Sequence, residues 1–150
     1  MGTDDAADPG ELAARLRPAL NQLHFMIRRR TPGPDLTPSQ QSVLSTLMAT
    51  GPIRMGELAR LERIRLPSTT SAVDGLERQG LVERTTDPTD RRAVVVQLSP
   101  EGIATTQELQ RARNEALAGF LATLSTGERE NLYTAIPALN RLTELYRSEP

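Results

Sequence analysis

The sequence predicts a mostly α-helical chain that carries one small β-hairpin, an α+β fold. Over most of the 150 residues, apolar side chains recur every three or four positions, which is the period of a helix with one buried face. Between residues 81 and 99 the period changes to two, which indicates two short strands. This length suits one domain with its own core, so we expect a single domain at residues 11–150 and a disordered tail at residues 1–10.

The first two predicted helices differ in how clearly their ends are marked. Residues 11–30 carry an apolar stripe of leucines, and Pro18 inside it is expected to kink or restart the helix. The second helix has a full set of start signals, with Thr37 as N-cap, Pro38 in the first position and Gln40 completing a capping box. A glycine just beyond residue 50 is expected to end it.

Two shorter helices are predicted within residues 55–64 and 66–80. We expect the inward side chains to be Met55, Leu58 and Ala59 in the first of them and Ala72, Val73 and Leu76 in the second. Pro67 and Gly80 are expected to mark the two ends of the second. Its outer face would then carry Ser68, Thr69, Ser71, Gly75 and Arg78.

A β-hairpin and two more helices complete the predicted order. Residues 81–86 and 93–99 are strand candidates, joined by the turn sequence DPTDRR. Ser99 is a good N-cap for a long helix that follows the hairpin directly. Ser125 and Glu128 form a second capping box, which starts the last helix.

Two short helices with a tight turn between them, followed by a hairpin, make a winged helix-turn-helix, which we place at residues 36–99. The flanking regions, residues 11–35 and 100–150, carry apolar stripes at Leu12–Ile27 and Leu132–Leu145, the second of them interrupted by Pro137. One chain of this size does not cover both stripes. We therefore expect these terminal helices to be dimerisation helices that form a homodimer.

Composition excludes several classes of function. The absence of cysteine excludes disulfides, thiolate catalysis, cysteine metal sites and thiol-based redox sensing. With one histidine, no glycine-rich phosphate loop and no metal-ligand spacing, we expect no enzyme, no catalytic residue, no metal and no cofactor. The net charge of −1 does not by itself indicate a nucleic-acid partner. No apolar run suits a membrane span and no signal-peptide pattern opens the chain, so we expect a cytoplasmic protein without a membrane partner.

The stretch ELARLERIRLPSTTSAVDGLERQGLVERTTDPTDRRAVVVQLSPEG, residues 57–102, resembles the MarR (multiple antibiotic resistance regulator) family of bacterial transcription factors. The turn DPTDRR, at this distance from a helix-turn-helix, carries most of the resemblance. The resemblance implies a homodimer, a pseudo-palindromic double-stranded DNA operator, repression in most cases, and often a small phenolic or other aromatic effector. Ser71 and Gly75 stand where family members often carry Arg or Lys, and the missing cysteine excludes the branch that senses peroxides through thiols.

The tip of the hairpin holds the first set of candidate DNA-binding residues, Asp90, Arg91 and Arg92. A hairpin tip that reaches DNA lies over the minor groove, and arginine suits this negative groove because its charge is permanent and its guanidinium is planar. Arg92 is the first candidate for the groove and Arg91 the second, on a phosphate. Asp90 would orient an arginine or cap the turn. The alternative is a solvated surface turn, and the helices upstream favour DNA.

The start of the second short helix holds the other candidates: Arg65, Ser68, Thr69, Thr70 and Ser71. Hydroxyls and free N–H groups at a helix start can bind phosphates or bases in the major groove, or they can simply cap the helix. His24 is the one ligand-binding candidate, although a hydrogen-bonded structural role is the favoured reading. An effector would bind between the terminal helices and the winged region, near His24 and the helix that follows the wing.

Two functions fit this arrangement. The favoured one is a sequence-specific DNA-binding transcriptional regulator, a homodimeric repressor released by a small aromatic ligand. The alternative is a winged-helix protein–protein adaptor that does not bind DNA. An adaptor has no need for two arginines at the wing tip, so the sequence DPTDRR favours the regulator.

Overall fold

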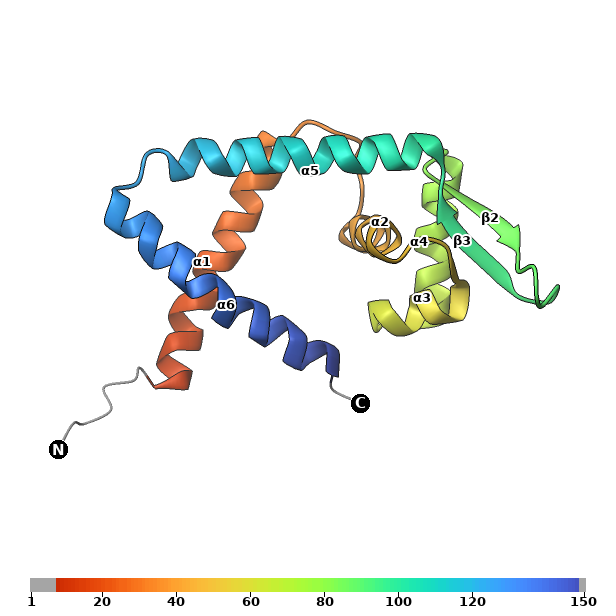
Figure 1. Cartoon of the computed structure of the whole chain (residues 1–150), viewed down its shortest axis with the longest axis horizontal. Helices are drawn as coiled ribbons and strands as arrows, with labels where there is room; N and C mark the ends of the chain where they lie inside the picture. The colour runs from red at the N-terminus through yellow and green to blue at the C-terminus, as the bar shows by residue number, and fades with distance from the viewer. Residues whose placement is uncertain (1–7, 149–150) are drawn as a thin grey trace.

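The computed structural model describes residues 8–148 and confirms the mostly helical class with one small sheet. Figure 1 shows the long helix α5 connecting the winged region at its N-terminal end to α1 and α6 at the other. The elements in chain order are α1 (Pro9–Arg30), α2 (Pro38–Thr50), β1 (Ile53–Arg54), α3 (Met55–Glu62), α4 (Leu66–Arg78), β2 (Val82–Thr86), β3 (Val94–Leu98), α5 (Pro100–Leu121) and α6 (Thr126–Ser148).

The predicted helix ends are largely confirmed, because their side chains make the expected capping bonds. Thr37 Oγ1 accepts from the amide of Gln40 at 3.2 Å, and Gln40 Oε1 accepts from the amide of Thr37 at 2.9 Å. Gly51, at the end of α2, has a φ of +74°, which a residue with a Cβ rarely adopts. At the start of α6 the amide of Ser125 donates to Glu128 Oε2 at 2.8 Å, so the second capping box is present as well.

The first helix begins earlier than predicted. Asp8 caps it by accepting from the amide of Glu11, and the helix begins at Pro9 rather than at residue 11. Residues 8–10 are therefore not part of a disordered tail, and residues 1–7 of the expected tail lie outside the described residues. Pro18 and Pro137 both lie inside continuous helices, so the predicted restart and interruption are wrong.

The sheet has one strand more than the sequence predicted. Its antiparallel order is β1-β3-β2, and β1 pairs Ile53 with Val96 and Arg54 with Val95. A strand of two residues is too short to show an alternating pattern, so only its pairing with β3 defines it. The strand matters because it brings Arg54 to the hairpin.

The hydrophobic core lies within the winged region. All residues of the buried cluster fall between Leu36 and Val96. They come from the loop before α2, from α2, α3 and α4, and from the hairpin. The predicted inward residues Val73 and Leu76 of α4 are completely buried.

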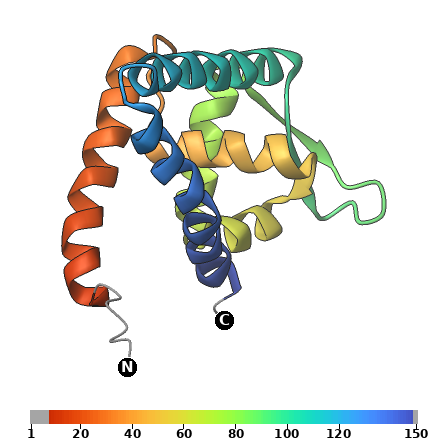
Figure 2. The same ribbon diagram turned by 60° about the vertical axis from the view of Figure 1, so that its left-hand side comes forward.

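Outside this core the long helices leave apolar side chains uncovered. No residue of α1 is buried, and Figure 2 shows α1 and α6 extending away from α5 as separate arms. The exposed large apolar residues on these two helices include Leu12, Leu20, Leu23, Leu132, Ile136, Leu142 and Leu145. In the described part of the chain no helix has the length and apolar character of a membrane span.

Candidate nucleic-acid interface

Helix α4 is held by its apolar face and presents its other face outward. The helix-turn-helix corner before it depends on Arg63, which ends α3 in the left-handed conformation with a φ of +52°. Ala72, Val73 and Leu76 then pack toward the core, against α2 and α3. On the opposite face Ser71 is exposed, and an accessible outer face is the arrangement required of a recognition helix.

Four of the five candidates at the start of α4 remain accessible. Arg65, Ser68 and Ser71 are exposed, and Thr70 is half-buried. The hydroxyl of Thr70 donates to the carbonyl of Leu66 at 2.9 Å, and that of Ser71 donates to the carbonyl of Pro67 at 3.0 Å. Since these protons are used inside the helix, the two hydroxyl oxygens can act toward a ligand only as acceptors, which suits the amino groups of cytosine or adenine.

Two residues expected on the outer face are buried instead. Thr69 is completely buried and its hydroxyl donates to the carbonyl of Arg65, so the predicted DNA contact by Thr69 is wrong. Gly75 is also buried, because the side chain of Gln40 from α2 lies over it. The helical period locates the boundary between the buried and exposed faces only to within about one residue. The packing of the neighbouring helices decides on which side of that boundary a residue lies.

At the wing tip Asp90, Arg91 and Arg92 are all exposed. Asp90 Oδ1 accepts from the amide of Arg92 at 3.0 Å, and the carbonyl of Asp90 accepts from the amide of Ala93 at 2.9 Å. Of the two predicted roles for Asp90, the structure thus shows turn capping. Within residues 8–148 the guanidinium groups of Arg91 and Arg92 have no hydrogen bond or ion pair, so both are available to an external anion.

The residue that organises the base of the wing, Asp87, is not among the predicted site residues. Asp87 is buried and accepts four hydrogen bonds, from the amide and hydroxyl of Thr89, the amide of Asp90 and the guanidinium of Arg54. The Arg54 guanidinium, helped by the Thr89 donors, holds the pKa of Asp87 far below its usual range. An Asp-Pro pair predicts a turn in any sequence. It gives no sign that the Asp87 carboxylate binds Arg54, which lies 33 positions upstream.

A second arginine ties the hairpin to the recognition helix. Arg84 of β2 donates to Asp74 at 2.5 Å and also to Glu77, both on α4. The single positive charge of Arg84 offsets part of the two negative charges that Asp74 and Glu77 place on α4. The two ion pairs are also contacts between β2 and α4, and they are partly exposed.

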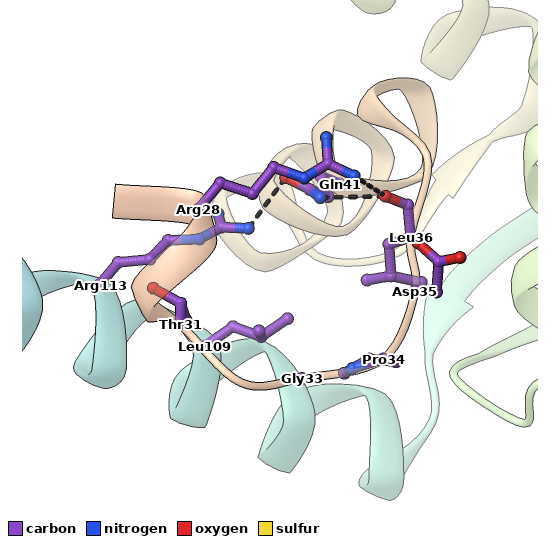
Figure 3. Close-up of a pocket in the computed structure, with 9 residues that line it drawn as sticks. All are labelled: Arg28, Thr31, Gly33, Pro34, Asp35, Leu36, Gln41, Leu109 and Arg113. Carbon is purple, nitrogen blue, oxygen red and sulfur yellow. Dashed lines mark hydrogen bonds between the residues drawn. The ribbon is translucent and has the colours of Figure 1, made fainter. Parts of the chain in front are cut away.

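A cavity of about 200 Å³ lies where the winged region meets the terminal helices, and it is lined from α1, α2, α5 and the loop after α1. Figure 3 shows two arginines at this cavity: Arg28 donates to the carbonyl of Leu36 at 3.1 Å, and Arg113 donates to Gln41 Oε1 at 2.8 Å. Neither guanidinium is paired with a carboxylate in the described residues. His24 is exposed on α1 and does not line this cavity.

The order of elements, the outward face of α4 and the arginine-tipped hairpin define a winged-helix protein. The sequence model of the MarR family matches residues 36–94. An uncharacterised HTH-type transcriptional regulator of Mycobacterium bovis is 38% identical over 133 residues, which cover 89% of this chain and 93% of the relative. The chain therefore belongs to the MarR family and is a DNA-binding transcriptional regulator, not an enzyme.

Solved structures agree with this assignment. A probable transcriptional regulator from Pseudomonas aeruginosa is 32% identical with a TM-score of 0.66, and the match covers 91% of this chain and 98% of the other. The PcaV transcriptional regulator from Streptomyces coelicolor, in complex with its natural ligand, is 25% identical with a TM-score of 0.59, over 94% and 97% of the two chains.

Proposed function

We propose that this regulator is a homodimeric repressor that binds a pseudo-palindromic double-stranded operator and is released from it by a small aromatic ligand. The observation that carries the proposal is the wing tip, where Arg91 and Arg92 lie exposed and without protein partners on a hairpin that ion pairs tie to α4. A bacterial regulator acts at the chromosome, so the proposed location is the cytoplasm.

The proposed DNA contacts divide between two grooves. The outer face of α4, with Arg65, Ser68, Thr70 and Ser71, enters the major groove, where base edges distinguish all four base pairs. The wing tip lies over the adjacent minor groove, with Arg92 in the groove, Arg91 on a phosphate and Asp90 holding the turn.

A dimer accounts for the uncovered apolar side chains of α1 and α6. Half-exposed leucines at regular helical spacing cost free energy in water, and a second copy of the chain would cover them. A two-fold axis through these helices would place the two α4 helices in successive major grooves, with half-sites about 10 base pairs apart. Such a dimer represses by covering the DNA that the transcription machinery needs.

The cavity between α1, α2 and α5 is the proposed ligand site. Two guanidinium groups without carboxylate partners suit an anion, and the small volume suits a single-ring carboxylate. The proposed ligand residues are therefore Arg28 and Arg113 rather than His24. A ligand that takes over the Arg113 guanidinium breaks its bond to Gln41, which joins α2 to α5. The winged region would then shift relative to the dimerisation helices.

Fluorescence anisotropy at several salt concentrations, on operator and on scrambled DNA, tests the DNA contacts. We expect Arg92→Ala to weaken binding to both DNAs, and each lost phosphate contact to flatten the log–log salt slope by about 0.9. Ser71→Ala should instead relax base preference at one or two operator positions by roughly 1–3 kcal/mol each. Arg111→Met, in an exposed ion-pair cluster on α5, controls for the loss of one charge. Full affinity with an unchanged slope in the Arg91/Arg92 double variant would support the adaptor alternative.

A further inference from the structure

The two oxygens of the Asp87 carboxylate accept hydrogen bonds from different parts of the chain at the base of the wing. Oδ1 accepts from the amide of Thr89 at 2.7 Å, from its hydroxyl at 2.6 Å and from the amide of Asp90 at 3.0 Å. These bonds are local and shape the turn. Oδ2 accepts from Arg54 Nε at 2.7 Å, which is a contact between segments that are far apart in the sequence.

Arg54 links the turn at Asp87 to the helix-turn-helix. It is the last residue of β1 and the N-cap position of α3, so its backbone belongs to the core sheet and to the first helix of the motif. Its Nη2 also donates to the hydroxyl of Thr89 at 3.3 Å. The guanidinium thus contacts the turn at two points, while Arg91 and Arg92 beyond it have no protein partner within residues 8–148.

We propose that the Arg54–Asp87 pair positions the wing for DNA, by fixing the turn relative to α3 so that Arg92 meets the minor groove without an ordering cost. The proposal rests on the proposed function of the wing. Arg54 and Asp87 are positioning residues, since they act through Arg92. A tip that must be ordered on binding loses part of the interaction free energy to that ordering, whereas a tip ordered in advance does not.

The sign of the effect separates positioning from plain electrostatics. Asp87 is a negative charge beside a DNA-binding hairpin, so charge alone predicts that removing it tightens DNA binding. Positioning predicts the opposite. Asp87→Asn is the matched variant, because an asparagine keeps an oxygen at the Oδ1 position for the turn and places an NH₂ group against the donating Nε of Arg54.

The experiment measures operator affinity by anisotropy for the dimer carrying Asp87→Asn, Arg92→Ala, or both. We expect Asp87→Asn to weaken binding about three- to tenfold. In the Arg92→Ala background, the same change should have almost no further effect, because its action passes through Arg92. A general folding defect would instead weaken both backgrounds equally, and thermal unfolding of each variant measures such a defect directly.

The outcomes are distinguishable. If Arg92→Ala weakens DNA binding, the wing binds DNA. The positioning proposal is then wrong if Asp87→Asn leaves operator affinity unchanged or higher, or if it weakens binding equally with and without Arg92→Ala. If Arg92→Ala has no effect, the proposed function of the wing fails first. Should Asp87→Asn not fold, Arg54→Met in the same two backgrounds replaces it, with Arg111→Met as the control for lost charge. Arg54→Met supports the proposal only if it weakens operator binding more than Arg111→Met does, and if this loss largely disappears in the Arg92→Ala background.

Discussion

Gly102, in the first turn of α5, lies directly against Leu81 at the start of the hairpin. A Cβ added at Gly102 would come within 1.8 Å of the Leu81 carbonyl oxygen, and that oxygen also accepts from the amide of Ser99. The hydroxyl of Ser99 in turn donates to the carbonyl of Gly80 and accepts from the amide of Gly102. This close approach joins the hairpin directly to α5, the long helix that leads to α6.

We expect Gly102→Ala to lower the free energy of unfolding by about 1–3 kcal/mol, because backbone rather than a flexible side chain meets the new methyl group. Gly119→Ala on the same helix is the control. Nothing lies within 4 Å of its added Cβ, so it should raise stability by about 0.5–1 kcal/mol. Urea unfolding measures both, and equal effects of the two changes would contradict the close approach.

The capping box of α2 also predicts a coupling to the recognition helix. A Cβ at Gly75 would lie 2.3 Å from Gln40 Nε2, so Gly75→Ala should displace the side chain that caps Thr37. Gln40→Ala alone should cost about 0.5–2 kcal/mol of stability through the lost cap. In the double variant the two losses should be clearly less than additive, since the clash disappears with the glutamine. If the two losses of stability are strictly additive in thermal unfolding, the Gln40 side chain does not clash with a methyl group at position 75, and the predicted coupling is wrong.

Acid should weaken the base of the wing. The hydrogen bond from Arg54, followed by those from Thr89, lowers the pKa of Asp87 in the folded protein. A lowered folded-state pKa contributes stability that is fully present above the unfolded value of about 3.9 and is lost as the pH falls through the folded value. The free energy of unfolding of the parent protein should therefore fall more steeply below about pH 4 than that of Asp87→Asn. Denaturant titrations across this range check the slopes, and parallel curves would argue against a native ionised Asp87.

The apolar stripe of α6 predicts a mutation that separates the dimer. Leu132→Glu with Ile136→Glu places two charges on the exposed stripe and should shift the protein to monomers at micromolar concentration. Thr134→Glu puts the same residue on the opposite face of the helix and should leave the dimer intact. Light scattering distinguishes the two masses. A dimer that survives both changes must use a different surface.

The cavity predicts a ligand response that depends on Arg113. Aromatic carboxylates such as benzoate should raise the unfolding temperature of the parent and release DNA, and a tenfold loss of DNA affinity corresponds to about 1.4 kcal/mol of coupling. Arg113→Met should abolish the response, whereas Arg111→Met on the same helix should retain it. An equal response in Arg113→Met would place the ligand elsewhere.

Local signals in the sequence were enough for most elements of the fold. Helix starts depend on a side chain reaching an amide three residues away, so Thr37, Ser99 and Ser125 could be identified without any tertiary information. The change of period from about 3.6 to 2 located the hairpin for the same reason. The exposed wing-tip arginines were also identified, because a turn that projects into solvent keeps its polar side chains outside.

What only the tertiary structure decided are the contacts between segments that are distant along the chain. Thr69 is completely buried, Gly75 is buried because Gln40 of α2 lies over it, and β1 exists only because β3 pairs with it. The pairing of Asp87 with Arg54 and the arginine-lined cavity likewise come from residues tens of positions apart. Residue type and spacing determine which face of an element is apolar. Which neighbour covers that face, and which charge meets which, depends on how the finished elements pack in three dimensions.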